Sequence, residues 1–446
     1  MNREILRLAL PSIISNITVP LLGLIDVAIT GHFDSTAYIG AIAVGGLIFN
    51  MLYWNFGFLR MGTSGLTAQA YGRGDAKGQM NILMQAMVVG LSAALLLLLF
   101  TSPIESLIFL FIDTSPQVAE LASDYYRIVI FGAPAILGMY AFNGWFIGMQ
   151  NTRYPMFIAI IMNVVNIGAS LVLVYIFDMK IEGVALGTLI AQYAGLFMAL
   201  GLWLKRYRGI GRGCRISDAL NGFELKRFFT LNSAIFFRTL CLIAVTTLFT
   251  WVGGKQGDTI LAVNTLLMQL FTIFSYILDG FAYAAESLVG RFTGAATYAL
   301  RRKAIQYLFR WSAMVMVLFT VAYWLGGSDF LSLLTDNDEV LNLSEHYFYW
   351  VLAVPLCGFS AFLWDGILIG ATATKEMFWA MLIAAILFFA TLFGVPFIVS
   401  GEASPMWSEP YNNHRLWLAF LIYLTTRGVV QHLLWRRELN RPDSTT

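Results

Sequence analysis

The sequence predicts an all-α integral membrane protein: twelve transmembrane helices in two six-helix bundles, related by a pseudo-two-fold axis along the membrane normal. Three observations predict this class, namely the composition, the spacing of the apolar runs and an internal repeat. Of the 446 residues, 58% are hydrophobic and only 12% are charged. So few charged side chains cannot cover the surface of a soluble protein of this size. The lipid bilayer is therefore the expected solvent.

The apolar runs have the length that a bilayer requires, about 20 residues each. Arg3 and Arg7 precede the first run, but no small-residue cleavage site follows it, so we expect it to be retained as a span. The predicted spans are 10–31, 38–69, 80–102, 124–148, 156–177, 183–204, 230–252, 259–289, 305–325, 346–371, 376–399 and 414–434.

The basic residues predict the topology. If the N-terminus is cytoplasmic, nearly all loop Lys and Arg residues fall inside, and only Lys180, Lys255 and Arg415 fall outside. This asymmetry follows the positive-inside rule. We therefore expect a multi-pass protein of the cytoplasmic (inner) membrane with both termini in the cytoplasm.

The chain repeats itself at an offset of 222 residues. The longest polar stretch separates a bundle at 1–204 from a bundle at 230–446, with a cytoplasmic linker at 205–229. Six spans per repeat bring both halves back to the same side, which requires an axis along the membrane normal and is typical of secondary transporters. The matched positions include Asn143 with Asp365, Gly144 with Gly366, Gly148 with Gly370, Leu66 with Leu288, and Gly72 with Gly294.

Asp26 is the residue around which the functional hypothesis is built. It lies in the outer half of the first span, where an ionised Asp costs roughly 2.5–3.5 kcal/mol. It precedes Gly31 by five residues, about 8 Å of helix, and its side chain is too short to reach far toward the interface. A proton or ion site is the first hypothesis, and an Asp that simply pairs near a helix end is the alternative. Pro11 and Pro20 make this span the best candidate for bending.

Further polar residues occur in the predicted spans of the first half. A carboxylate with amides and a hydroxyl nearby can hold or release a proton, depending on its solvation. Alternatively, such groups join helices, at about 0.6 kcal/mol each. The candidates are Asn143, Asn163, Asn166, Thr188 and Gln192.

The second half supplies the candidates Arg238, Asp279 and Asp365. Arg238 can neutralise either carboxylate, which would make the group structural, or the carboxylates can serve a cationic substrate. Both interpretations remain open at this point. Glu286 is expected at the cytoplasmic edge of its span, close to Arg291.

Several classes of function are disfavoured. The three cysteines and four histidines show no metal-ligand spacing, so we expect no metal, no cofactor and no enzyme site. The basic residues cluster at helix ends rather than on one face, so no nucleic-acid partner is expected. A membrane-embedded enzyme is the weakest alternative, because no His or Cys constellation supports it.

Three stretches carry a family resemblance: LIDVAITG at 24–31, GMQNTRYP at 148–155 and DGFAYAAESLVG at 279–290. With Asn232 and Arg238-Thr239, the chain resembles the multidrug and toxic compound extrusion (MATE) transporters, particularly the branch named after the DNA-damage-inducible protein F. The resemblance covers essentially the whole chain. It implies a V-shaped pair of bundles around a central cavity, which exports hydrophobic, often cationic compounds in exchange for protons or sodium.

The resemblance also implies residue roles. Asp26 matches the first-span aspartate whose protonation is thought to bend the helix and release substrate, and Asn143, Asn166 and Thr188 fall in the polar network of the first bundle. Ser170 departs from the pattern, because some members carry a second aspartate there. This favours protons over sodium as the coupling ion. Arg238 stands where another branch has a glutamate, which places that branch's second-bundle cation site in doubt.

These observations predict a proton-coupled antiporter that exports hydrophobic or cationic small molecules by alternating access. We expect lipid as its surroundings, H+ (with Na+ as the alternative) as the coupling ion, and a monomer. A lipid or lipid-linked-sugar flippase is the first alternative. It would require a strongly cationic cavity, for which Arg238 and Arg60 are the candidate residues.

Overall fold

The computed structural model describes residues 1–30, 33, 35–110, 114–210, 219–332, 334–335, 337–394 and 411–439, and within these ranges it contains helices and no strand. The first half contains α1 (Asn2–Thr30), α2 (Ala37–Trp54), α3 (Gly57–Gly72), α4 (Ala76–Leu99), α5 (Thr101–Phe109), α6 (Pro116–Val129), η1 (Ile130–Gly132), α7 (Ala133–Gly148), α8 (Arg153–Tyr175) and α9 (Ile181–Tyr207). The second half contains α11 (Gly222–Lys255), α12 (Asp258–Gly294), α13 (Tyr298–Ser332), α14 (Asp338–Gly370), α15 (Thr374–Phe389), η2 (Ala390–Gly394) and α17 (Tyr411–Leu439).

The twelve predicted spans are confirmed as helices, and two of them are composite. The second span is α2 followed by α3, and the fourth is α6, η1 and α7 in succession. Ten helical segments are long and apolar enough to cross a membrane, and α1 and α17 complete the twelve. The ends of the first and eleventh spans, beyond Thr30 and Gly394, and linker residues 211–218 lie outside the described residues.

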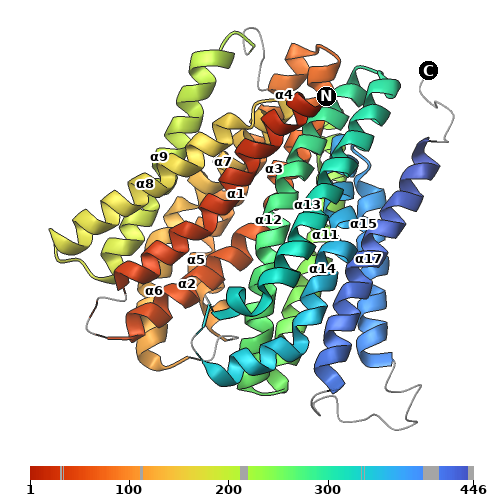
Figure 1. Cartoon of the computed structure of the whole chain (residues 1–446). Helices are drawn as coiled ribbons and strands as arrows, with labels where there is room; N and C mark the ends of the chain where they lie inside the picture. The colour runs from red at the N-terminus through yellow and green to blue at the C-terminus, as the bar shows by residue number, and fades with distance from the viewer. Residues whose placement is uncertain are drawn as a thin grey trace.

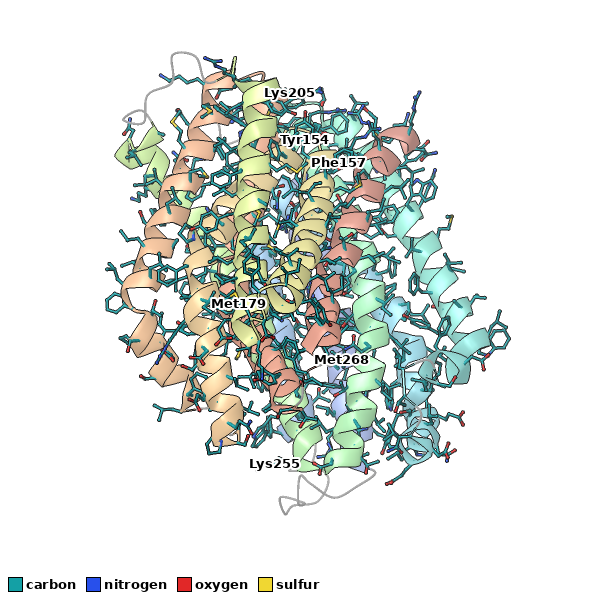
Figure 2. The ribbon with its side chains drawn as sticks, turned by 90° about the vertical axis from the view of Figure 1, so that its left-hand side faces the viewer. Tyr154, Phe157, Met179, Lys205, Lys255 and Met268 are labelled. Carbon is teal, nitrogen blue, oxygen red and sulfur yellow. The ribbon has the colours of Figure 1, made fainter. Side chains whose placement is uncertain are left out.

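The ends of the bundle agree with the predicted alternation of loops. Helix α1 begins, and α17 ends, at the same end of the molecule (Figure 1). Lys205, at the end of α9, and Lys255, at the end of α11, lie at opposite ends (Figure 2). An even number of crossings separates the start of α1 from the end of α17, as the predicted topology requires.

Helix α1 runs unbroken through Pro11 and Pro20. It lies between α8 of the first half and α12 of the second half (Figure 2). A helix in this position contacts both halves of the molecule. The bending expected of it from the two prolines stays a prediction.

The repeat is visible in the backbone itself. Among the described residues with positive φ angles, four in helix-ending turns form two pairs at the 222-residue offset: Gly74 (φ 71°) with Ala296 (φ 53°), and Gln150 (φ 61°) with Thr372 (φ 57°). In each turn a backbone N–H reaches back to a carbonyl five residues earlier, as Asn151 does to Phe146 and Ala373 to Leu368. The two halves therefore end equivalent helices with the same geometry, even where the second copy has Ala or Thr.

The two halves meet where α3 and α12 approach closely. Gly72 faces the carbonyl oxygen of Arg291, and its repeat mate Gly294 faces the carbonyl oxygen of Gln69. A Cβ atom at either glycine would overlap backbone atoms of the other helix. This reciprocal contact marks where the pseudo-two-fold axis passes, and only glycine permits it.

Gly72→Ala is therefore expected to destabilise the protein by about 1–3 kcal/mol, because the added methyl forces two backbones apart. Thermal unfolding of the purified protein in detergent measures the effect. Gly168→Ala on α8 is the matched control, since a Cβ there meets no atom within 4 Å. The control should be neutral or stabilising by about 0.5–1 kcal/mol. Equal unfolding temperatures for the two variants would contradict the close approach.

Candidate functional site

Asp26 lies in the interior of the first half, at 3% exposure. The Thr188 hydroxyl on α9 donates to Asp26 Oδ2 at 3.3 Å, and Asn166 Nδ2 on α8 donates to Thr188 Oγ1 at 3.1 Å. A hydroxyl has one proton and two lone pairs, so Thr188 can fill both roles at once. The chain of hydrogen bonds ties α1 to α9 and α8 through one carboxylate.

Each end of this chain of hydrogen bonds has an acceptor oxygen without a donor. Asp26 Oδ1 and Asn166 Oδ1 are buried without a hydrogen-bond partner among the described residues. An ionised carboxylate in such surroundings is costly. The site therefore holds an acidic oxygen at which a proton would remove a buried charge.

The other predicted members of this network lie apart from the chain of hydrogen bonds. Asn163 Nδ2 donates to the backbone oxygen of Thr18 at 2.7 Å, which joins α8 to α1 directly. Ser170 and Gln192 are buried, and Ser170 Oγ, Gln192 Oε1 and Asn143 Oδ1 have no partner among the described residues. The structure thus brings Asn166 and Thr188 to Asp26, and does not link the remaining four to it by hydrogen bonds.

In the second half, the choice that the sequence left open for Arg238 is decided in favour of Asp365. Arg238 and Arg427 both donate to Asp365 Oδ2, and Gln431 Nε2 donates to Asp365 Oδ1. All four side chains are buried. Two guanidinium groups therefore share one carboxylate, and the cluster (Arg238, Asp365, Arg427 and Gln431) has an excess of one positive charge.

A second buried ion pair connects the two halves. Arg60 on α3 lies 3.3 Å from Glu286 on α12, and Ser64 Oγ donates to the same Glu286 oxygen at 2.6 Å. The Arg60 guanidinium also lies 4.2 Å from the centre of the Tyr283 ring. Glu286 is buried in the α3–α12 interface, at 1% exposure. Its expected place at the cytoplasmic edge of its span stays a prediction.

Asp279 differs from the other interior carboxylates. It is half-buried on α12 and makes no hydrogen bond or ion pair with the described residues. Arg60, Arg238 and Arg427 act on it only electrostatically, at longer range. It can therefore balance the excess positive charge of the Asp365 cluster without holding either arginine in place.

Sequence reasoning missed Arg427, Gln431 and the pairing of Glu286. Arg427 is an ionisable residue within the apolar run of the twelfth span, a signal that was present in the sequence. Ser64 and Glu286 are separated by 222 residues, the repeat offset. Repeat mates that lie on the axis must face each other, so this pair was also accessible to a symmetry argument.

Metal ligands do not gather in the described part of the chain. No group of three or more His, Cys, Asp or Glu side chains there is arranged to hold a metal ion. The Asp26 region contributes one carboxylate, one hydroxyl and one amide to its hydrogen-bonded chain.

Comparison with known proteins places these features in a family. The MatE family model matches twice, at residues 11–172 and 234–396, once in each half. The DNA damage-inducible protein F of Escherichia coli (strain K12) is 37% identical over 438 residues, covering 98% of this chain and 92% of that protein. The multidrug resistance protein MdtK of Cronobacter sakazakii is 24% identical over 458 residues, covering 100% of this chain and 97% of that protein.

The fold agrees with a solved structure. A crystal structure of a MATE protein in the bent conformation superimposes with a TM-score of 0.85 at 17% identity, covering 98% of this chain and 95% of that one. The two matched segments of the family model, which begin at residues 11 and 234, also reproduce the repeat found in the sequence. The chain belongs to the MatE family of multi-pass membrane transporters, whose relatives include multidrug efflux proteins.

Proposed function

We propose that this protein is a proton-coupled antiporter that exports hydrophobic, often cationic small molecules across the cytoplasmic membrane, with both termini in the cytoplasm. One observation carries the coupling assignment: the buried Asp26 carboxylate is hydrogen-bonded on one oxygen only. A carboxylate in this state gains from a proton that neutralises it. The family relationship supports transport of small substrates.

Protonation would act through the helices that the Asp26 chain joins. A hydrogen bond to a charged acceptor is roughly twice as strong as one to a neutral acceptor. Neutral Asp26 therefore holds Thr188 less tightly, and the contact between α1 and α9 weakens. Because α1 also packs against α12 of the second half, a shift of α1 changes how the two halves meet.

The donor set at Asp26 favours a proton over sodium. Hard cations are held by several oxygen ligands, which include carboxylates, carbonyls and water. Ser170, one turn after Asn166, carries a neutral hydroxyl, so a sodium ion would have one fewer anionic ligand than with a carboxylate at this position. We therefore assign H+ as the coupling ion.

The flippase alternative is disfavoured by the pairing of the interior arginines. A lipid pyrophosphate would require guanidinium groups that are free to bind it. Arg60 is paired with Glu286, and Arg238 and Arg427 are paired with Asp365. Transfer of a fluorescent lipid between leaflets of liposomes tests this alternative, and we expect no acceleration over protein-free liposomes.

The proposal is tested by dye efflux in inverted membrane vesicles under separately imposed gradients. A pH gradient alone should drive uptake of a cationic dye, whereas a sodium gradient at equal pH should not. Vesicles without the protein give the background rate. Uptake driven by sodium and indifferent to pH would reject proton coupling but keep the transport assignment.

A further inference from the structure

A cationic pocket lies at the end of the bundle where α1 begins and α17 ends (Figure 1), away from Asp26. It occupies about 190 Å³ between the α3–α4 turn and the start of α11, a space equal to about six water molecules. Residues of both halves line it, because α3 and α4 belong to the first repeat and α11 to the second. None of the residues assigned to transport above lines this pocket.

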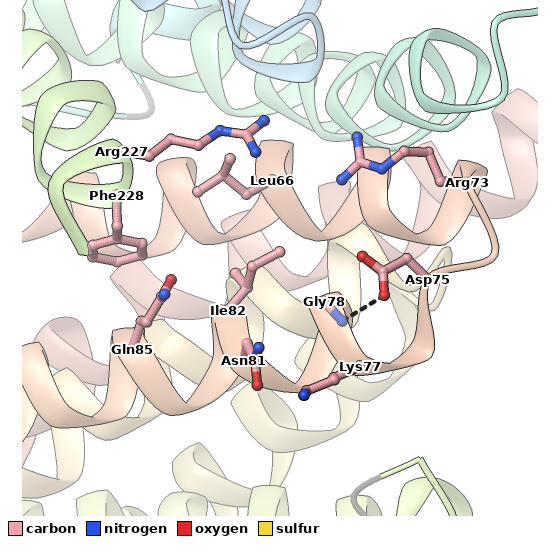
Figure 3. A pocket seen from close by; sticks show the side chains of 10 residues that line it. All are labelled: Leu66, Arg73, Asp75, Lys77, Gly78, Asn81, Ile82, Gln85, Arg227 and Phe228. Atoms are coloured by element: carbon pink, nitrogen blue, oxygen red, sulfur yellow. Dashed lines mark hydrogen bonds between the residues drawn. The ribbon is translucent and has the colours of Figure 1, made fainter. Parts of the chain in front are cut away.

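The rim of the pocket is positively charged. Three basic side chains line it, those of Arg73, Lys77 and Arg227, together with one carboxylate, Asp75. Figure 3 shows the Arg73 and Arg227 side chains extending toward each other, with Leu66 beside Arg227. Neither guanidinium group makes a hydrogen bond or ion pair with the described residues, so their N–H donors are available to a ligand.

The rest of the lining is fixed and partly polar. Asp75 accepts a hydrogen bond from the Gly78 backbone at 2.7 Å and thereby caps α4. Gln85, at the base, is held by its hydrogen bond to the Ala219 backbone oxygen at 2.8 Å. Asn81 has a buried side-chain oxygen without a partner among the described residues. Phe228 is buried and closes the base from the α11 side.

We propose that this pocket binds a phosphate group, either in the headgroup of an anionic phospholipid or in a soluble phosphate compound. Guanidinium forks match phosphate oxygens in a bidentate geometry, and basic pockets between transmembrane helices are typical sites for anionic lipid headgroups. The two guanidinium groups suit a group that carries one to two negative charges. A bound phosphate would join Arg73 of the first half to Arg227 of the second half.

The two sources of phosphate are distinguished with two probes on the full-length protein. In the first experiment, protein in phosphatidylcholine nanodiscs is titrated with inorganic phosphate. In the second, native mass spectrometry of the protein in detergent compares how much phosphatidylglycerol and how much phosphatidylcholine it retains. The double variant Arg73→Gln/Arg227→Gln should weaken binding of the relevant probe by about tenfold or more, since hydrogen bonds to charged groups contribute about 1.5–3 kcal/mol. The matched control Arg208→Gln/Lys226→Gln removes the same charge from exposed residues outside the pocket and should bind as the unmodified protein does.

Asp75→Asn is expected to change phosphate binding in the opposite direction to the arginine variant. Asn also caps helices, so the turn should persist, while loss of the carboxylate should strengthen binding. The expected order of binding is Asp75→Asn strongest, the unmodified protein next and the double arginine variant weakest. Phosphatidylglycerol retained in this order supports a lipid headgroup. Inorganic phosphate bound in this order, without retained phosphatidylglycerol, supports a soluble ligand. The proposal is overturned if neither probe binds, or if the pocket variants and the matched control lose binding equally.

Discussion

Asp26→Asn is expected to abolish pH-driven efflux while the protein remains folded. Asparagine has nearly the shape of aspartate and keeps an oxygen that can accept from Thr188, but it cannot gain or lose a proton in the working range. Dye uptake into inverted vesicles should fall to the protein-free background at every imposed pH gradient. The reason is that the variant has only the neutral state of the hydrogen-bonded chain and cannot alternate between two.

Asp178→Asn is the matched control for this experiment. It makes the same chemical change at an exposed carboxylate with a left-handed φ of 54°, a conformation that Asn tolerates. Its efflux should equal that of the unmodified protein. Efflux by Asp26→Asn that keeps its pH dependence would refute the coupling role, provided that Asp178→Asn is also active.

Asp365→Asn is expected to cause the largest loss of stability, about 3–5 kcal/mol. The change leaves Arg238 and Arg427 buried together without their shared carboxylate. Removing one partner of a buried charge cluster is costly, because the remaining charges are neither solvated nor paired. The unfolding temperature of the purified protein in detergent should fall accordingly.

Two further variants make this prediction specific. Asp338→Asn changes an exposed carboxylate at the first turn of the same helix, α14, and should cost less than about 1 kcal/mol. Arg427→Met should cost less than Asp365→Asn, because Arg238 and Asp365 then remain as a one-to-one pair. If Asp365→Asn and Asp338→Asn unfold at the same temperature, the buried cluster does not contribute as described.

The positions of the helices could be predicted well because they depend on local properties. A span needs about 20 apolar residues whatever its neighbours are, and ten helical segments of the described chain meet this condition by length and composition. Composite spans were harder to predict, since the break between α2 and α3 at Asn55–Phe56 and the turn at η1 lie within apolar sequence. Neither Pro11 nor Pro20 interrupts α1, because a long helix packed on both sides can accommodate a missing backbone donor.

The partners of the polar residues could be predicted only in part. Asp26 was identified from the cost of a carboxylate in lipid, and Asn166 and Thr188 as polar residues within predicted spans. Asn163, three residues from Asn166, instead binds the backbone of α1. A sequence shows that a polar group needs a partner, but several partners on other helices satisfy that need equally.

By itself, the sequence determined the membrane environment, the twelve helices, their six-plus-six repeat and the acidic residue in the first span. Each of these follows from the order of apolar and polar residues along one stretch of chain, or from a match at one offset. Only the tertiary structure decided that Asp365 takes both Arg238 and Arg427, that Arg60 joins Glu286 across the two halves, and that Arg73 and Arg227 share a pocket. These pairs join residues at least 62 positions apart, and their contacts depend on how each helix is rotated about its axis against its neighbours.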